Sequence, residues 1–243
     1  MKKTILPLAA IVAVTAMTAV PSVAQAELAF NVGAVTDYRY RGISQTRLKP
    51  AIQGGIDFSA GGFYVGTWAS SIKWIKDAGG NSDAEVDFYG GYKGEIAKDL
   101  AYDVGVLRYQ YFSHDLAVSP NTTEVYGALT FGPATLKYSH AVTNLFGFAD
   151  SKNSSYIDLS ASFDVGGGFM LSPHIGYQKV KNNSDFSYTD YSLGVSKDFS
   201  GVVVSAAVVY ADVKKLGGVP AYVGPNGKNL GKAGVVLGVK YSF

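Results

Sequence analysis

The chain of 243 residues has no cysteine, only three histidines and few charged side chains, which make up 16% of the sequence. The absence of cysteine excludes disulfide bonds, thiolate metal ligands and a cysteine nucleophile. The 21 basic and 19 acidic residues leave a net charge of +2, which provides no bulk attraction for nucleic acid. We therefore expect no nucleic-acid partner, no metal site and no cofactor.

Beyond its first residues the chain also lacks long apolar runs, because none approaches the roughly 18 residues that a membrane helix needs. At the start, two lysines precede an apolar run over residues 5–20, and the small residues Ala24 and Ala26 follow it. This order is typical of a secretory signal peptide. We expect residues 1–26 to be removed by cleavage after Ala26, so that the mature protein spans residues 27–243.

Glycine and aromatic residues are abundant, with 29 glycines and 13% aromatics. Apolar residues alternate with polar ones or glycine along much of the chain, and this period of two indicates β-strands. The final segment is an example, since Val235, Leu237 and Val239 alternate with Gly234, Gly238 and Lys240. We predict twelve strands, at residues 28–41, 51–59, 63–74, 84–94, 101–113, 123–131, 134–144, 155–164, 169–179, 188–198, 202–212 and 233–243.

The connections between these strands alternate between short and long. The long ones are rich in Asn, Ser, Asp, Lys and Gly, and they fall at residues 42–50, 75–83, 114–122, 145–154, 180–187 and 213–232. Tight turns at one end and longer loops at the other are typical of outer-membrane barrels. Because every backbone polar group must pair in lipid, such a sheet closes on itself. The sequence therefore predicts an all-β fold, a closed antiparallel transmembrane β-barrel with both termini on its periplasmic side.

Three of the predicted strands are irregular. In 101–113 the apolar positions change parity, which predicts a bulge near Leu107. Pro173 removes a backbone donor within 169–179 and predicts a second bulge. Residues 63–74 fit either register, so the pattern leaves open whether Trp68 faces lipid or the interior.

Aromatic and basic residues near the predicted strand ends suggest where a membrane surface lies. We expect interfacial aromatic belts from Tyr40, Tyr92, Tyr109, Tyr111, Tyr138, Tyr177, Tyr210, Tyr241 and Phe243. Lysines near the loops are candidates to contact lipopolysaccharide phosphates, although solvated lysines give the same pattern; they are Lys49, Lys73, Lys76, Lys152, Lys179 and Lys181.

Four segments carry a family resemblance. They are Asp37–Thr46 (DYRYRGISQT), Pro50–Asp57 (PAIQGGID), Gly62–Ser70 (GFYVGTWAS) and Glu85–Tyr92 (EVDFYGGY). With these residues the chain resembles the TorF family of porins from Gram-negative bacteria. The resemblance implies an outer-membrane barrel among lipids and lipopolysaccharide. The C-terminal Phe243 on an alternating strand is similar to the signal that the outer-membrane assembly machinery reads.

Alternation and strand direction place nine charged residues near the predicted extracellular end, all pointing inward. They are Asp37, Arg39, Arg41, Glu85, Asp87, Arg108, Glu124, Asp158 and Asp190. As pore-lining residues they would set a transverse field that filters small polar or ionic solutes in a water-filled lumen. The same residues would instead pair with one another and hold together a nearly closed barrel. The pattern leaves both interpretations open.

Two further functions remain as alternatives to a porin-like channel for passive diffusion. A closed structural or adhesion barrel would act through its extracellular loops, of which 213–232 is the longest. An outer-membrane lipid hydrolase needs a serine and a histidine base within hydrogen-bond reach. The best candidate is His114 in Ser113-His114-Asp115, and the chain has no G-x-S-x-G motif. We therefore expect that the protein is not an enzyme.

Overall fold

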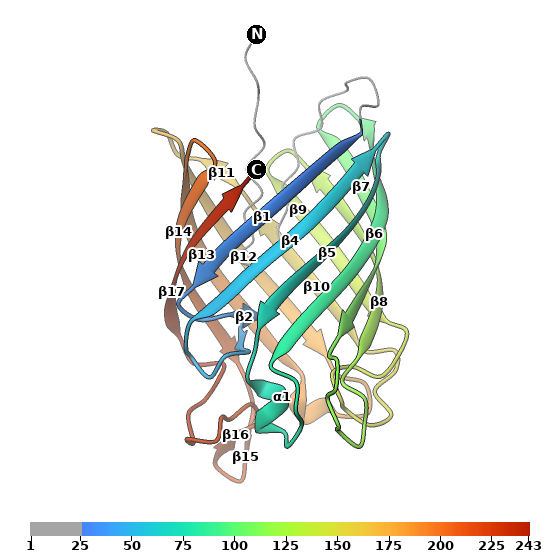
Figure 1. Cartoon of the computed structure of the whole chain (residues 1–243), viewed down its shortest axis with the longest axis vertical. Coiled ribbons are helices and arrows are strands. Elements are labelled where there is room, and N and C mark those ends of the chain that lie inside the picture. The colour runs from blue at the N-terminus through green and yellow to red at the C-terminus, as the bar shows by residue number, and fades with distance from the viewer. Residues whose placement is uncertain (1–25) are drawn as a thin grey trace.

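The computed structural model describes residues 26–243, which form a closed barrel of twelve long antiparallel strands (Figure 1). The long strands are β1 (Glu27–Val35), β4 (Ala51–Ala60), β5 (Phe63–Ser71), β6 (Ala84–Ala97), β7 (Leu100–Gln110), β8 (Thr122–Phe131), β9 (Ala134–Ala141), β10 (Ser155–Ala161), β12 (Phe169–Lys179), β13 (Tyr188–Phe199), β14 (Val202–Asp212) and β17 (Gly234–Ser242). The predicted signal peptide lies outside the described residues, except for Ala26.

Shorter elements lie between the long strands. They are β2 (Arg39–Tyr40), β3 (Ile43–Ser44), α1 (Trp74–Asp77), β11 (Phe163–Asp164), a 3-10 turn (Ser184–Phe186), β15 (Lys215–Leu216) and β16 (Val219–Pro220). Within residues 26–243 no helix has the length and apolar character to cross a membrane.

Pairing of the first long strand with the last closes the sheet. β1 pairs with β4 on one side and with β17 on the other, and β10 pairs with β12 across the remaining gap. Each long strand therefore has a hydrogen-bonded neighbour on both sides, and the barrel has no open edge. The predicted fold class is confirmed.

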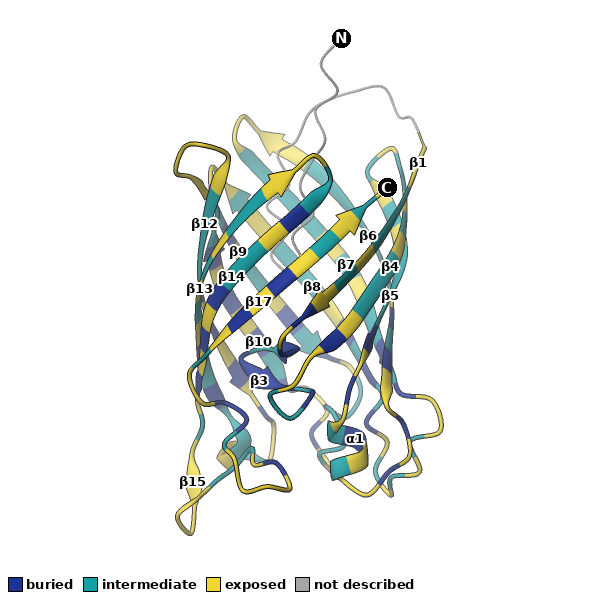
Figure 2. Ribbon diagram, turned by 60° about the vertical axis from the view of Figure 1, so that its left-hand side comes forward, coloured by how far each residue is buried: buried dark blue, intermediate teal, exposed yellow. Residues whose placement is uncertain are grey.

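Side chains alternate between the two surfaces of the barrel. On β13, Tyr191, Leu193 and Val195 are exposed on the outside, whereas Ser192 and Ser196 point inward. The alternation of exposed and less exposed residues is visible along the strands in Figure 2. Because successive strand residues face opposite sides, the exterior is apolar and the interior polar or small, as the alternation predicted.

The two ends of the barrel differ. β1 begins and β17 ends at one of them, the terminal end, where the connections between strands are short (Figure 1). The longer connections, α1 among them, gather at the opposite end, the loop end. At the loop end an apolar cluster forms inside the fold, and Ile72, Ile75 and Tyr111 are almost completely buried in it. Short turns and long loops thus fall at opposite ends, as expected.

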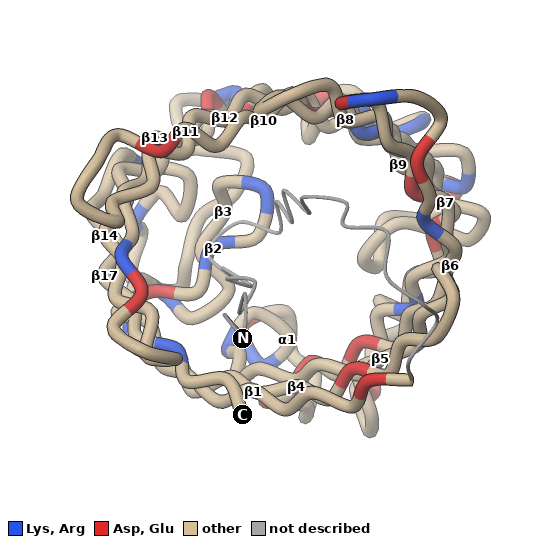
Figure 3. Tube along the Cα trace, turned by 90° about the horizontal axis from the view of Figure 1, so that it is seen from above, with Lys and Arg blue, Asp and Glu red and all other residues tan. Residues whose placement is uncertain are grey.

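Residues 36–46 depart from the prediction, because β1 ends at Val35 and the chain then enters the barrel. There β2 and β3 form a hairpin, the inner hairpin, which lies inside the ring of strands in Figure 3. Arg41 and Gly42 between them have φ of 46° and 78°. Positive φ at both central residues is the signature of a two-residue type I′ hairpin. The predicted strand over 28–41 was too long, since the hairpin continues the same period of two.

The predicted bulge near Leu107 is absent. Pairing of β6 with β7 is regular there, and its one shift lies between Glu95 and Ala97. Arg108 therefore keeps the orientation of the exposed Val104 and Val106, and it lies on the outer face, where it donates to Thr123 Oγ1 at 2.9 Å. The prediction that Arg108 points inward was wrong, for this reason.

Pro173 causes an interruption rather than a bulge. β12 pairs with β13 without a register shift at this residue. On its other side the partner strand breaks at Ser162, between β10 and β11, and the register is the same before and after the break. The missing proline donor thus weakens the hydrogen-bond ladder locally.

The structure also resolves which way Trp68 faces. Its side chain points from β5 toward the interior, and in register Trp68 lies opposite Gly55 of β4 and Asp87 of β6.

Candidate functional site

Asp37 holds the base of the inner hairpin together. Its carboxylate accepts hydrogen bonds from Arg39 Nε at 2.5 Å, Ser44 Oγ at 2.5 Å and Thr46 Oγ1 at 3.2 Å. These donors come from both strands of the hairpin and from the residues after it. The predicted inward carboxylate is therefore occupied by its own segment.

Arg39 joins the inner hairpin to the loop before β17. Its Nη1 donates to the carbonyl oxygens of Gly42 at 2.9 Å, Leu230 at 2.9 Å and Lys232 at 3.2 Å. Backbone acceptors together with Asp37 surround the guanidinium. Arg39 therefore acts as a structural clamp that ties two distant segments together at the loop end.

Arg41, in the turn of the hairpin, reaches another part of the barrel wall. It binds Glu124 of β8 through two hydrogen bonds, Nη1 to Oε1 at 3.0 Å and Nη2 to Oε2 at 2.7 Å. Its Nη1 also donates to Gln178 of β12 at 2.6 Å, and its guanidinium lies 4.1 Å from the ring centre of Tyr156. Only 7% of the Arg41 side chain and 2% of the Glu124 side chain are exposed. Burial acts to lower the pKa of Arg41, but its interactions with Glu124, Tyr40 and Tyr109 together outweigh burial, and the pKa rises well above its usual value.

Buried tyrosines fasten the hairpin to the opposite wall. Tyr38 and Tyr111 both donate to the carboxylate of Glu85, each at 2.5 Å, and the hydroxyls of Tyr40 and Tyr109 lie 2.5 Å apart. Burial, together with the nearby Glu85, raises the pKa of Tyr38, so the phenol stays a neutral donor. Tyr109 and Tyr111 are 3% and 1% exposed. The prediction of interfacial belts at Tyr40, Tyr109 and Tyr111 was wrong, because these rings point into the barrel.

The turn of the inner hairpin packs tightly against β13 and β14. A Cβ added at Gly42 would lie 2.7 Å from Cβ of Asp190 and 2.9 Å from Cβ of Ala211. Asp190 accepts a hydrogen bond from Tyr156 at 2.9 Å and lies 3.5 Å from Nδ1 of His174. A side chain at this position would collide with β13 and β14, so only glycine fits. Together with the bonds of Arg41 and the tyrosines, this packing gives the hairpin contacts on several sides of the wall.

The remaining predicted site residues lie on the inner faces of long strands, with Glu85 and Asp87 on β6, Glu124 on β8, Asp158 on β10 and Asp190 on β13. Asp87 Oδ1 is buried without a hydrogen-bond partner among the described residues, and Asp158 is the register partner of Lys137. The arrangement brings Arg41 to Glu124 and leaves Arg39 with Asp37. These residues form a network of hydrogen bonds and ion pairs at the loop end. Their predicted pore-lining role stays a prediction.

Tyr64 and Tyr89, which the sequence analysis missed, line the interior toward the terminal end together with Tyr126. Tyr64 donates to Asp103 at 2.6 Å and Tyr89 donates to Asp57 at 2.5 Å. Each interior ring lies opposite a glycine of the neighbouring strand, in the register pairs Tyr64–Gly91, Tyr89–Gly66 and Tyr126–Gly105. Glycine leaves the space that the ring fills, and these cross-strand pairs are the signal that would have revealed the tyrosines.

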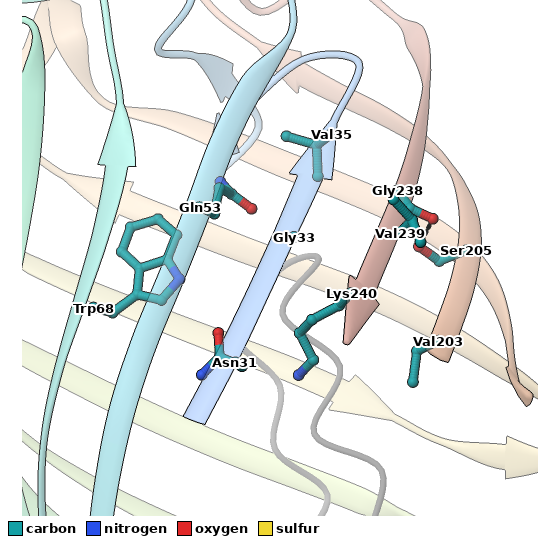
Figure 4. Close-up of a pocket in the computed structure, with 10 residues that line it drawn as sticks. All are labelled: Asn31, Gly33, Val35, Gln53, Trp68, Val203, Ser205, Gly238, Val239 and Lys240. Carbon is teal, nitrogen blue, oxygen red and sulfur yellow. Dashed lines mark hydrogen bonds between the residues drawn. The ribbon is translucent and has the colours of Figure 1, made fainter. Parts of the chain in front are cut away.

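A pocket lies on the inner wall where β1, β4, β5, β14 and β17 meet (Figure 4). Its polar lining includes Asn31, Gln53, Ser205 and Lys240, and Trp68 forms one side. The part of the chain that the structure describes contains no group of three His, Cys, Asp or Glu residues arranged to hold a metal ion.

The histidines do not form the pairs that a serine hydrolase needs. His114 Nδ1 accepts the backbone N–H of Leu116 at 3.1 Å, and Ser160 Oγ, across from His174, is buried without a partner among residues 26–243. Within these residues no serine hydroxyl is hydrogen-bonded to a histidine ring. The geometry thus gives no nucleophile–base pair.

Solved porins share the fold at low sequence identity. The KdgM porin, solved in complex with disordered oligogalacturonate, is 9% identical with a TM-score of 0.56, and the match covers 90% of this chain and 99% of that one. The NanC porin is 11% identical with a TM-score of 0.53, and the match covers 89% and 99% of the two chains. At this identity the likeness concerns the fold alone. No curated protein matches the sequence.

A family model matches residues 19–243, and its description is "Bacterial protein of unknown function (Gcw_chp)". This description does not mention the TorF family that residues 37–92 resemble, so that assignment stays a prediction. The match extends over the whole barrel, from before β1 to the last residue. The chain therefore belongs to the bacterial Gcw_chp family.

Proposed function

We propose that this protein is an outer-membrane channel for the passive diffusion of small polar or ionic solutes. The observation that carries the proposal is the inverted distribution of side chains in a closed barrel. Large apolar residues are exposed on the outside, whereas carboxylates, lysines and tyrosine hydroxyls face inward. Exposed apolar area of this extent is favourable against lipid, and a polar interior is favourable against water.

Aromatic residues on the outer face support a membrane position. Near the terminal end the exposed aromatics are Phe63, Phe131, Phe169, Phe199, Tyr241 and Phe243, and nearer the loop end they are Tyr138, Tyr177, Tyr191 and Tyr210. Aromatic girdles at both interfaces are typical of barrels that cross a lipid bilayer. In this orientation the terminal end faces the periplasm and the loop end faces outward.

Within the proposed channel the inner hairpin is the constriction. It occupies part of the interior at the loop end, and Arg41 bridges from it to Glu124 and Gln178. A closed structural or adhesion barrel is the second candidate, because the same buried ion pair supports a plug as well as a narrowed passage. The solved complex of KdgM with oligogalacturonate supports including ionic solutes in the tests.

The proposal includes two kinds of partner. We propose that lysines at the loop end, such as Lys179 and Lys181, contact lipopolysaccharide phosphates in the outer leaflet. Phe243 is 65% exposed on the outside of the barrel, and we propose that the outer-membrane assembly machinery recognises it as part of the C-terminal strand. We further propose that the protein has no enzymatic activity.

Planar-bilayer recording tests the channel. Purified protein is expected to give discrete conductance steps, and reversal potentials in a salt gradient give its ion preference. Arg41→Ala is expected to increase the step size, because the hairpin loses its bridge to the wall. The exterior variant Arg108→Ala is the matched control and is expected to leave the step unchanged. A silent bilayer with correctly folded protein would support the closed barrel instead.

A further inference from the structure

Lys240 of β17 carries a positive charge into the interior, and among residues 26–243 it has neither a hydrogen bond nor an ion pair. In register it lies between Gly33 of β1 and Val203 of β14. Its Nζ is buried and has no hydrogen-bond partner among the described residues. Burying an ammonium group is costly unless an anion or hydrogen bonds compensate it. The position of Lys240 therefore requires an explanation.

The backbone around Lys240 leaves space for its side chain. A Cβ added at Gly33 would lie 2.7 Å from the carbonyl oxygen of Val239 and 3.4 Å from Cβ of Lys240. A larger residue at Gly33 would therefore clash with the backbone of β17 next to Lys240. In Figure 4 the Lys240 side chain extends from β17 alongside β1, toward the end of β1 where Asn31 lies.

The side chains of Asn31 and Trp68 both pack over a second glycine, Gly55 of β4, on the same inner wall as Lys240. A Cβ added at Gly55 would lie 3.0 Å from Nδ2 of Asn31 and 3.2 Å from Cδ1 of Trp68. Gln53, two residues before Gly55 on β4, lines the same pocket. Asn31, Gln53, Trp68 and Lys240 all line this pocket, and Figure 4 shows them on the same stretch of the barrel wall. The four side chains thus offer a cation, two amides and an aromatic ring.

Asp57 is the acidic group that acts on Lys240 electrostatically, but it is not in ion-pair contact with it. Asp57 is on the same inner wall, but its carboxylate accepts the hydroxyl of Tyr89 at 2.5 Å, and within residues 26–243 it forms no ion pair with Lys240. Lys93 and Lys137, which also face the interior, lie over the rings of Tyr64 and Tyr126. Lys240 has no such ring contact in the described structure.

From this geometry we propose that Lys240, Asn31, Gln53 and Trp68 form a binding subsite for a small organic anion, a carboxylate-bearing solute with a sugar-like ring. Lys240 pairs with the carboxylate, the amides bind hydroxyl groups, and the indole packs on the apolar face of the ring. The proposal rests on the proposed function, because the solute reaches this pocket through a water-filled interior. The channel would thus bind solutes of this class during their passage.

Current blockade in planar bilayers tests the subsite with three probes: glucuronate, which has ring and carboxylate, glucose, which has the ring alone, and gluconate, which has the carboxylate alone. Glucuronate is expected to interrupt the current for longer than either of the others. Lys240→Gln is expected to shorten the glucuronate events about tenfold, the loss typical of one charge-assisted hydrogen bond. Lys93→Gln removes the same charge elsewhere in the interior and is expected to change them little.

Tryptophan fluorescence supplies a second measurement that does not depend on conduction. The chain has two tryptophans, so Trp74→Phe leaves Trp68 as the reporter. Titrating this variant in detergent with glucuronate is expected to change its fluorescence with saturation, and glucose is expected to have a much weaker effect. The change is expected to disappear with Lys240→Gln and to persist with Lys93→Gln.

The outcomes separate the subsite from the channel. Conducting protein without selective glucuronate events and without a fluorescence response overturns the subsite and leaves the channel standing. Equal effects of Lys240→Gln and Lys93→Gln also overturn it, because they indicate general electrostatic attraction. A saturable Trp68 response in protein that does not conduct supports the subsite and contradicts the channel.

Discussion

At the scale of single residues, the pair of Arg41 and Glu124 is the contact on which the interior depends most. A guanidinium that binds a carboxylate through two hydrogen bonds has a fixed geometry, which lysine does not reproduce. Both side chains are almost completely buried. Such a pair adds little stability compared with a well-packed apolar pair, yet removing one partner leaves a charge without compensation.

The first prediction is that Arg41→Ala destabilises the folded barrel by about 3–5 kcal/mol, because Glu124 stays buried without its cation. The double variant with Glu124→Gln is expected to recover part of the loss, since the neutral amide is less costly to bury. Arg108→Ala, on the outer face, serves as the control. The measurement is urea-induced unfolding in lipid vesicles, and equal effects of Arg41→Ala and Arg108→Ala would contradict the interpretation.

At the scale of elements, the inner hairpin differs from the rest of the fold because its turn touches the wall. Gly42 needs a positive φ and lies against Asp190 and Ala211. Gly79, after α1, has a φ of 90° and no atom within 4 Å of an added Cβ. The two glycines therefore share the backbone requirement and differ in the space around them.

We predict that Gly42→Ala lowers stability more than Gly79→Ala does. The backbone strain costs about 1–2 kcal/mol at either position, and overpacking adds about 1–3 kcal/mol at Gly42 alone. Gly42→Ala is also expected to change the conductance step, because the hairpin shifts. Thermal unfolding in detergent and bilayer recording check both statements. A similar loss for the two variants would show that the turn does not press on the wall.

Local pattern explains what could be predicted about these elements. The twelve strands follow from alternation and from connection lengths, which neighbouring residues determine. The inner hairpin escaped prediction because Arg39 to Ser44 preserves the alternation of the strand before it. The pattern predicts the wrong side for Arg108 because it assigns Tyr109 and Tyr111 to an outward belt, whereas a barrel interior accepts tyrosine equally well. The bond from Arg41 to Gln178 joins residues 137 positions apart, and no local pattern contains such a contact.

At the scale of the whole molecule, the proposed membrane position depends on which surface of the barrel is apolar. Ser192 and Leu193 are adjacent in the middle of β13 and face opposite sides, inward and outward. The same new residue placed at each position therefore compares the two surfaces directly.

We predict that Leu193→Arg weakens folding into lipid vesicles, by about 2–4 kcal/mol for a charge near the bilayer midplane. Ser192→Arg is expected to fold nearly as well as the parent protein, because its charge enters the polar interior. Urea titration of folding in vesicles measures both. Equal folding of the two variants would be incompatible with a lipid-facing exterior.

The pairing of β1 with β17 makes the seam of the barrel the contact between the earliest and the latest strands of the chain. A nascent or truncated polypeptide that stops before residue 234 has two unsatisfied edges, on β1 and on β14, which would pair with other chains. Assembly must therefore wait for the final segment, whose backbone bonds Phe243 to Phe30 in both directions. The formation of β17 is thereby a condition for closing the wall of the barrel.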